Sequence, residues 1–223
     1  LITLLVVGSL IFGCTTSAPV LKSAAYRQLY VEKPLTILLM PPINRTTNVD
    51  AKEYFHATLA TTLAEKGFYV LPTFMSMDIL RRESAYDAEL FVSAPLNKFG
   101  SVFGADVVLF TIVHKWEKSA LMSTVKINIE YVLKSVKTDE VLFQRRGNVT
   151  YDVSVNSGSS GLAGLAVSMI ASEINTAATK YVSVARMANE YTLSDLPFGK
   201  YSTTFMQDTA QVAGPKEFNV VVK

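Results

Sequence analysis

The sequence predicts an α/β fold in which a mixed sheet is flanked by helices, with a long carboxy-terminal helix and an extended tail. Three observations lead to this prediction. In the first half of the chain, short apolar runs bounded by Pro or Gly alternate with segments of helical periodicity, as in strand–helix units. The continuous apolar run from Val107 to Val113 has the composition of a strand that is covered on both faces. Two segments of alternating polarity, joined near residues 137–140, predict a long antiparallel hairpin.

The chain begins with an apolar segment, Leu1 to Gly13, which directly precedes its only cysteine, Cys14. A run of about 13 apolar residues is shorter than the ~20 that a transmembrane helix needs, and it has the length of a signal-peptide core. An apolar core that ends at a small residue before a cysteine is typical of a bacterial lipobox. We therefore expect residues 1–13 to be a lipoprotein signal peptide, and Cys14 to be the lipidation site, with palmitate or a similar acyl chain as the membrane anchor.

Residues 14–33 show no clean hydrophobic period and are interpreted as a lipidated tether. Removal of the leader leaves 210 residues, a length that suits one domain, which we place at residues 34–196. From residue 197 to residue 223 the periodicity is lost again, and only Phe218–Val222 has the character of a strand. This last segment is interpreted as a carboxy-terminal extension.

The first half of the domain predicts the order strand, helix, strand, helix. The apolar run from Leu35 to Met40 ends at two prolines and predicts a strand. Asp50 and Glu53 have the spacing of a capping box, so a helix is expected from there to about Lys66. Its expected buried residues are Phe55, Leu59 and Leu63. The remaining predictions here are a strand at Phe68–Leu71, a helix around Met77–Leu80, and a short helix from Pro95 to Gly104.

The second half predicts a central strand, a hairpin and a long helix. The central strand is Val107–Val113, and the hairpin spans residues 123–154 with its turn at Lys137–Glu140. The segment Asn156–Gly161 has the composition of a flexible linker, and a long helix is expected from about Leu162. The apolar stripe expected to pack this helix against the sheet consists of Ile170, Ile174, Ala177, Tyr181, Val184 and Ala188.

The composition excludes several classes of site. The 21 basic and 19 acidic residues nearly balance, and neither sign forms a long block, so the chain has no footprint for nucleic acid. A single cysteine allows no disulfide within the chain and no multi-cysteine metal site. Because 49% of the residues are hydrophobic and only 18% are charged, we expect the fold to depend on its packed core.

Candidate catalytic residues are few. His56 falls on the first helix beside a core position, where a boundary histidine is ordinary. His114 is expected at the end of the central strand, where it and Glu117 would need a further carboxylate in a cleft to act as a catalyst. Gly158, Gly161 and Gly164 lack the lysine and the strand-turn-helix setting of a phosphate loop. We therefore predict no catalytic residues, no cofactor and no metal.

The chain resembles a family of outer-membrane lipoproteins that is catalogued as domain of unknown function 799. The segments that carry the resemblance are Gly13-Cys14, Lys33–Asn44, Glu65–Pro72, Phe103–Asp106, and the Ser/Gly-rich segment that leads into the last helix. The family is similar to the amino-terminal domain of TolB and to the periplasmic domain of CsgG, a lipoprotein of curli secretion. This resemblance implies a mixed sheet flanked by helices and a CsgG-like lipoprotein as partner, and it assigns no catalytic residues.

The leading hypothesis is a non-enzymatic lipoprotein, anchored at the outer membrane through Cys14 and facing the periplasm, that binds other envelope proteins during secretion or surface assembly. Thr15 after Cys14 fits outer-membrane sorting, as the resemblance implies. One alternative is a self-assembling subunit, because exposed strand edges favour pairing and most assemblies are symmetric. Another is a lipoprotein hydrolase that acts on envelope glycan or lipid.

Overall fold

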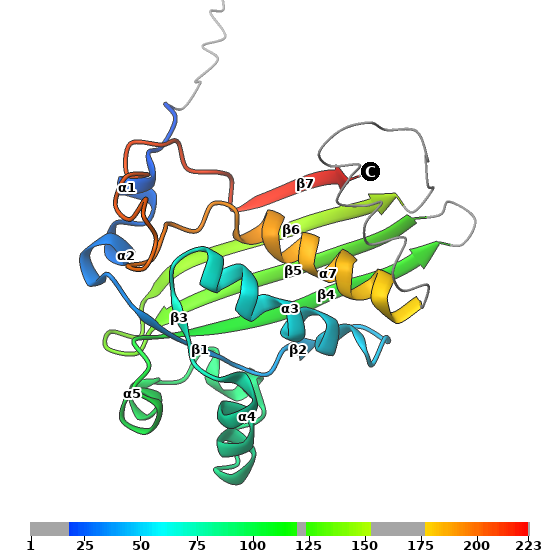
Figure 1. Cartoon of the computed structure of the whole chain (residues 1–223), viewed down its shortest axis with the longest axis horizontal. Helices are drawn as coiled ribbons and strands as arrows, with labels where there is room; N and C mark the ends of the chain where they lie inside the picture. The colour runs from blue at the N-terminus through cyan, green and yellow to red at the C-terminus, as the bar shows by residue number, and fades with distance from the viewer. Residues whose placement is uncertain (1–17, 120–123, 153–176, 223) are drawn as a thin grey trace, which may run out of the picture.

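The computed structural model of the chain describes residues 18–119, 124–152 and 177–222, and a seven-stranded mixed sheet forms their centre (Figure 1). The strands follow the order β3-β1-β4-β5-β6-β7, and β2 pairs with β4 beyond the end of β1. Their bounds are β1 Thr36–Leu39, β2 Ile43–Asn44, β3 Tyr69–Val70, β4 Val107–Ser119, β5 Thr124–Ser135, β6 Val141–Asp152 and β7 Glu217–Val222. The predicted fold class, a mixed sheet flanked by helices, is confirmed.

The sheet has a parallel part and an antiparallel part. Strands β1, β2 and β3 run parallel to their neighbours, whereas β4, β5 and β6 form an antiparallel meander. The predicted hairpin is therefore present as β5 and β6, with its turn at residues 136–140. The predicted central strand is also present, because β4 has β1 and β2 on one side and β5 on the other.

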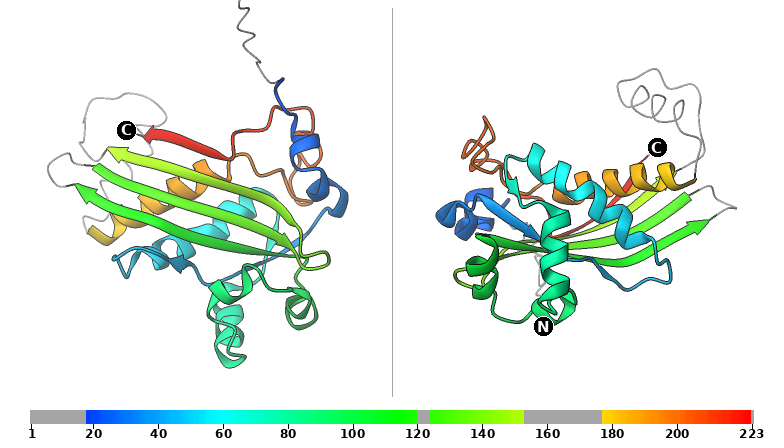
Figure 2. Two further views of the ribbon diagram at one scale, coloured as in Figure 1. Left: turned by 180° about the vertical axis from the view of Figure 1, so that it is seen from behind. Right: turned by 60° about the horizontal axis from the view of Figure 1, so that its bottom comes forward.

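Helices cover the two faces of the sheet unequally (Figure 2). Helices α3 (Ala51–Glu65) and α7 (Ala177–Leu193) lie side by side across one face. The other face is covered only towards one end, by α4 (Thr73–Arg82), the short 3-10 helix η1 (Ala88–Phe91) and α5 (Asn97–Phe103). A separate core forms on each face, because each group of helices buries its own set of apolar side chains.

In helix α3 the apolar residues that repeat at helical spacing are the ones that pack in the core. The predicted face residues Phe55, Leu59 and Leu63 are all fully buried against the sheet and α7. Burial of one such side chain contributes roughly 1.5–3 kcal/mol. The helix ends where expected, because Gly67 adopts a backbone φ of +86°, a conformation that favours glycine.

The start of α3 differs from the predicted capping box. Asp50 makes no side-chain capping hydrogen bond, because its backbone is already helical (φ −79°, ψ −15°) rather than extended. The chain is instead turned into the helix by Asn44, whose side-chain amide donates to the carbonyl of Asn48 over 2.8 Å. The Asn48 side chain in turn accepts a hydrogen bond from the backbone of Asp50.

Strand β4 is longer than predicted, which corrects the position of His114. We expected the strand to end there, but β4 continues to Ser119 after a bulge between Val113 and Lys115. The bulge explains the error, because one extra residue interrupts the alternation that the sequence would otherwise show. His114 therefore lies within the sheet.

The long helix is described from Ala177 onward as α7. Val184 and Ala188 of the predicted stripe are buried and Tyr181 packs beside them, so this part of the prediction is confirmed. Ile170, Ile174 and the linker Asn156–Gly161 lie outside the described residues.

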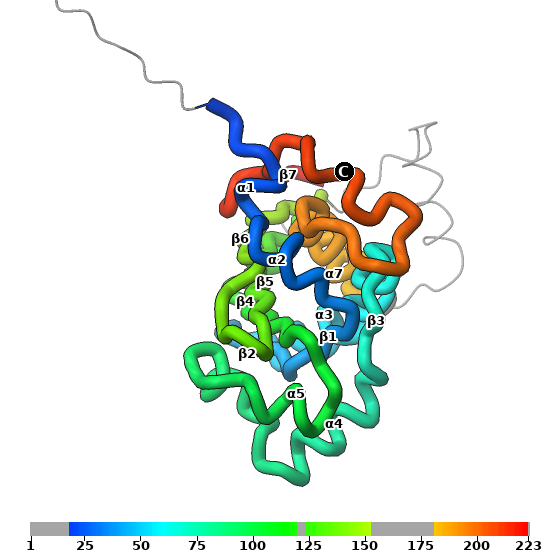
Figure 3. The backbone as a smooth tube through the Cα atoms, turned by 90° about the vertical axis from the view of Figure 1, so that its left-hand side faces the viewer, coloured from blue at the N-terminus to red at the C-terminus, as the bar shows by residue number. Residues whose placement is uncertain are grey.

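Both terminal segments are more closely integrated than we expected. Residues 22–32, interpreted as tether, form two short helices, α1 (Lys22–Ala25) and α2 (Arg27–Glu32). The extension after residue 197 returns along α1 and then adds β7 to the sheet, parallel to β6 (Figure 3). The contacts that order each segment come from the opposite end of the chain.

Candidate functional site

A cleft of about 370 Å³ lies between α3, α4 and the segment that follows β1. Its lining comes from three connections around the parallel strands: Pro41–Asn44 after β1, Lys52 and His56 on α3, and Arg81 on α4. α3 connects β1 and β2 to β3 on one face, whereas α4, η1 and α5 connect β3 to β4 on the other. Such a change of face is where open α/β sheets commonly bind ligands.

His56 is the unusual group in this cleft. Neither of its ring nitrogens has a hydrogen-bond partner among the described residues, although both atoms are buried. Burial lowers the pKa of His56, which favours the neutral ring. A neutral ring can accept one hydrogen bond and donate another, so both hydrogen-bonding capacities of His56 are unused among the described residues. As predicted, it lies at the boundary of the core.

The second candidate is the part of the sheet that no described helix covers, which we call the open face (Figure 2). Its polar side chains extend across β4, β5 and β6 and bond to one another: His114, Asn128, Glu130, Gln144, Arg146 and Asn148. The Nε2 atom of His114 lies 2.8 Å from the Oε2 atom of Glu130, whose Oε1 atom accepts from Gln144 over 2.6 Å. This arrangement holds the side chains in a fixed pattern.

The charges of the open face are stabilised locally. Burial alone would raise the pKa of Glu130, but hydrogen bonds from Gln144 and His114 lower it, and the net shift is downward. Arg146 donates to Asn128 over 2.7 Å and lies 4.0 Å from Glu217 of β7. The face therefore presents ordered donors and acceptors of mixed charge.

The structure does not bring the predicted catalytic candidates together. Glu117 forms its ion pair with Lys115 over 3.0 Å, whereas His114 contacts Glu130. Trp116 packs in the core against Phe55, with ring centroids 5.4 Å apart. Within the described part of the chain, no group of His, Cys, Asp and Glu side chains could hold a metal ion.

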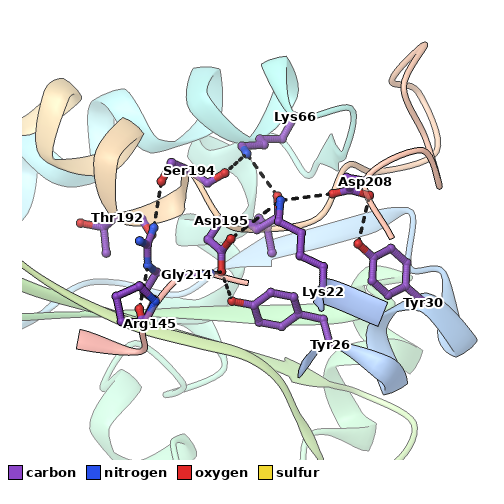
Figure 4. A network of polar contacts seen from close by, with 12 residues as sticks. Lys22, Tyr26, Tyr30, Lys66, Arg145, Thr192, Ser194, Asp195, Asp208 and Gly214 are labelled. Atoms are coloured by element: carbon purple, nitrogen blue, oxygen red, sulfur yellow. Dashed lines mark hydrogen bonds and ion pairs between the residues drawn. The ribbon is translucent and has the colours of Figure 1, made fainter. Parts of the chain in front are cut away.

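The sequence did not predict a third polar cluster. We call it the terminal clasp, because its residues join the two ends of the domain (Figure 4): Lys22, Tyr26, Tyr30, Asp195 and Asp208. The Lys22 ammonium lies 3.8 Å from Asp195 and 3.5 Å from Asp208, and all three side chains are almost fully buried. No local pattern could reveal the pairing of Lys22 and Asp208, because their positions differ by 186 residues.

Two further cations stabilise the end of α7 beside the clasp. Lys66 donates to the carbonyls of Ser194 and Leu196, over 2.7 and 3.1 Å. Arg145 donates to the carbonyls of Tyr191 and Thr192 in the last turn of the helix. Cations are favourable at a helix carboxyl end, so the clasp and these two residues are a structural assembly.

The predicted lipidation site, Cys14, falls outside the described residues, as do Gly158, Gly161 and Gly164, which the sequence did not predict to form a phosphate loop. Among the helices that the structure does describe, none has the length and apolar character needed to span a bilayer.

Comparison with known proteins identifies relatives. The family described as "Putative lipoprotein GNA1162-like" matches residues 24–199. "Putative lipoprotein NMB1124/NMB1162" of Neisseria meningitidis serogroup B is 26% identical over 156 residues, which are 69% of this chain and 72% of the relative. The crystal structure of lipoprotein GNA1162 from Neisseria meningitidis has a TM-score of 0.51 at 24% identity and covers 62% of this chain and 96% of that one.

These matches confirm the resemblance to a lipoprotein family of unknown function, and the solved structure shows that the fold is shared. A PelC dodecamer from Paraburkholderia phytofirmans is a more distant neighbour, with a TM-score of 0.45 at 16% identity over 73% of this chain and 86% of that one. That likeness is too low to support an argument about assembly.

Proposed function

Because the chain belongs to the family of GNA1162-like lipoproteins, we propose that it is a non-enzymatic accessory binding protein of the bacterial envelope. Its acylated Cys14 anchors it in the outer membrane with the domain facing the periplasm. The domain binds other envelope proteins during secretion or surface assembly, and a CsgG-like lipoprotein is the expected partner.

The open face is the observation that carries this proposal. Its six polar side chains are ordered by mutual hydrogen bonds, and no described helix covers them. Polar groups that are already fixed lose little side-chain entropy when a partner binds, which favours recognition. His114 pairs with Glu130 on the open face, outside the cleft around His56, which supports binding rather than hydrolysis, since a catalyst would need converging groups in a cleft.

Photo-crosslinking in intact cells tests the proposal. A photoreactive amino acid replaces Lys126, an exposed residue of β5 on the open face, and in a matched strain it replaces Thr61, an exposed residue of α3 on the helical side. We expect Lys126 to give an adduct with another envelope protein and Thr61 to give little. Absence of any adduct from Lys126, or equal adducts from both positions, would contradict the proposed role of the open face.

One observation favours self-assembly as a second candidate. β7 is the last strand in the order of the described sheet, and its Val221 side chain is 67% exposed. An exposed edge strand can pair with another chain. Adducts of Lys126 with a second copy of the protein would support this candidate. So would an apparent molar mass, measured by light scattering, that increases with protein concentration. A monomer at every concentration would exclude it.

A further inference from the structure

We infer that the end of the molecule formed by Val20, Leu21 and Val212 rests in the headgroup region of the membrane, so that the cleft faces away from it. We call these three residues the apolar ridge. Their exposed fractions are 54%, 42% and 56%, within the range of the other exposed aliphatic residues, but here three of them lie together. The inference deepens the proposed function and rests on its anchor at Cys14.

Backbone contacts make the ridge one surface. Leu21 and Val212 form an antiparallel bridge, and the amide of Ala213 donates to the carbonyl of Val20 over 2.8 Å. The amides of Lys22 and Ser23 donate to the carbonyls of Gln211 and Thr209. The terminal clasp lies directly beneath, because Lys22 follows Leu21 and is buried with Asp208. The chain is therefore fixed to the domain from Val20 onward.

The distance along the chain then limits where the membrane can be. Six residue steps separate Cys14 from Val20, and a fully extended chain covers at most ~3.6 Å per residue, so Val20 lies within roughly 22 Å of the anchored cysteine. Helix α7, with 17 residues at 1.5 Å each, is about 26 Å long. The distance between the ridge and the anchored cysteine is therefore shorter than helix α7.

The charge around the ridge suits a lipid surface. Residues 18–27 and 209–216 contain no Asp or Glu, although the whole chain has 19 acidic residues. The exposed charged side chains in these two segments are Arg27 and Lys216, both basic, and the exposed Glu217 that follows Lys216 lies 4.0 Å from Arg146. Exposed aliphatic groups flanked by basic residues favour the interface of a membrane with anionic lipids. A protein partner would not explain why these features lie next to the anchor.

The orientation has a consequence for binding. α1, which directly follows the ridge, lies in the upper part of the molecule in Figures 1 and 3, whereas α4, which lines the cleft, projects from the lower side. With the ridge on the membrane, His56 and the rest of the cleft face the periplasm. A small ligand can then reach the cleft without displacing lipid.

Fluorescence quenching on the lipidated protein tests the inference. The acylated protein is reconstituted in vesicles of phosphatidylethanolamine and phosphatidylglycerol that contain lipids with spin-labelled headgroups. Because Cys14 is the only natural cysteine, Val212→Cys gives a single free thiol for a fluorophore. Val20→Cys is a second ridge position. The matched control is Val102→Cys on α5, because Val102 has almost the same exposed fraction, 57%.

We expect the spin-labelled lipids to quench the fluorophores at positions 212 and 20 several-fold more strongly than the one at position 102. Equal quenching at all three positions, on protein that floats with the vesicles, would overturn the orientation and leave the anchor intact. Protein that does not float with the vesicles would refute the anchor, and with it both this inference and the proposed function.

Discussion

Lys22 is a buried charge that joins residues from opposite ends of the chain, and its removal should be costly. Replacing it in Lys22→Met leaves Asp195 and Asp208 buried without their cation. Breaking a buried ion pair by removing one partner typically costs ~3–5 kcal/mol, so we expect the free energy of unfolding to fall by about 3 kcal/mol. Urea denaturation at neutral pH measures this change.

The control for this experiment is Lys52→Met. Lys52 lies 3.9 Å from Glu53, but the two side chains are 37% and 66% exposed, and exposed pairs contribute only ~0–1 kcal/mol. Adding Asp208→Asn to Lys22→Met should recover part of the lost stability, because one uncompensated charge is removed. Equal, small effects of both lysine substitutions would show that the clasp contributes little to stability.

The lowered pKa of Lys66 makes the stability of the protein depend on pH. Burial, followed by the charge of Lys22, lowers the pKa of Lys66 to about 8 from an ordinary value near 10.5. Between these two values the unfolded chain binds more protons than the folded one, so the free energy of unfolding rises with pH. Above about pH 10 the sign reverses, because burial and hydrogen bonds to Asp195 and Asp208 raise the pKa of Tyr26 and Tyr30 above that of a free tyrosine.

We therefore expect stability to increase by on the order of 1–2 kcal/mol from pH 8 to pH 10, a value reduced for the partial exposure of Lys66. Urea denaturation across this range measures the slope. Lys66→Met should abolish most of the increase, since methionine does not titrate. An unchanged slope in this variant would assign the pH dependence to other groups.

At the scale of elements, the end of α3 packs closely against the segment after α7, and Gly67 allows this contact. A Cβ atom at Gly67 would lie 2.3 Å from the backbone nitrogen of Ser202 and 2.9 Å from the carbonyl oxygen of Gly199. Gly67→Ala should therefore cost more than the ~1–2 kcal/mol of a left-handed backbone alone. Thermal and urea unfolding measure the loss.

Gly104 provides the matched control for Gly67. It also has a positive φ, +67°, at the end of a helix, but a Cβ atom there would meet nothing within 4 Å. Gly104→Ala should show only the conformational cost. If the two substitutions destabilise the protein equally, the contact between α3 and residues 199–202 is not tight in solution.

The elements that the sequence predicted well are those whose burial follows a local period. Phe55, Leu59 and Leu63 repeat at helical spacing, and the alternating residues of β5 reflect one covered face, so composition and pattern were sufficient. Helices α1 and α2 have only four and six residues and are stabilised by partners near residue 208. Short helices of this kind have little stability of their own, so no local signal predicted them.

The candidate sites could also be predicted only where their residues form a local pattern in the sequence. The sequence places His114 after a continuous apolar run, but its partner Glu130 is set by the register of β4 and β5, which includes a bulge. The cleft around His56 depends on α4 and η1, whose positions follow from tertiary packing. Lys22 and Asp208 are single charges in irregular segments, and only the fold brings them together.

At the scale of the whole molecule, the carboxy-terminal segment should be needed for a stable domain. A chain that ends at Leu196 loses Asp208, the partner of Lys22 and Tyr30, and also loses β7. We expect its free energy of unfolding to be lower by at least about 3 kcal/mol, the cost of a broken buried pair. A chain that ends at Lys216 keeps Asp208 and lacks β7, so it separates the two contributions. If the chain that ends at Leu196 unfolds at the same urea concentration as the whole protein, the domain is complete without this segment.

The proposed anchor at Cys14 would determine where the whole molecule works, and Cys14→Ser tests it directly. Each acyl methylene buried in a bilayer contributes ~0.8 kcal/mol, so several chains on one cysteine give a stable anchor, whereas a protein without them is released. In cells supplied with labelled palmitate, we expect the variant to incorporate no label. It should either leave the outer-membrane fraction for the periplasm or keep an uncleaved leader. Because the chain has no other cysteine, no second thiol can substitute. A variant that still fractionates as a lipid-modified membrane protein would show that residues 1–14 are not a lipobox.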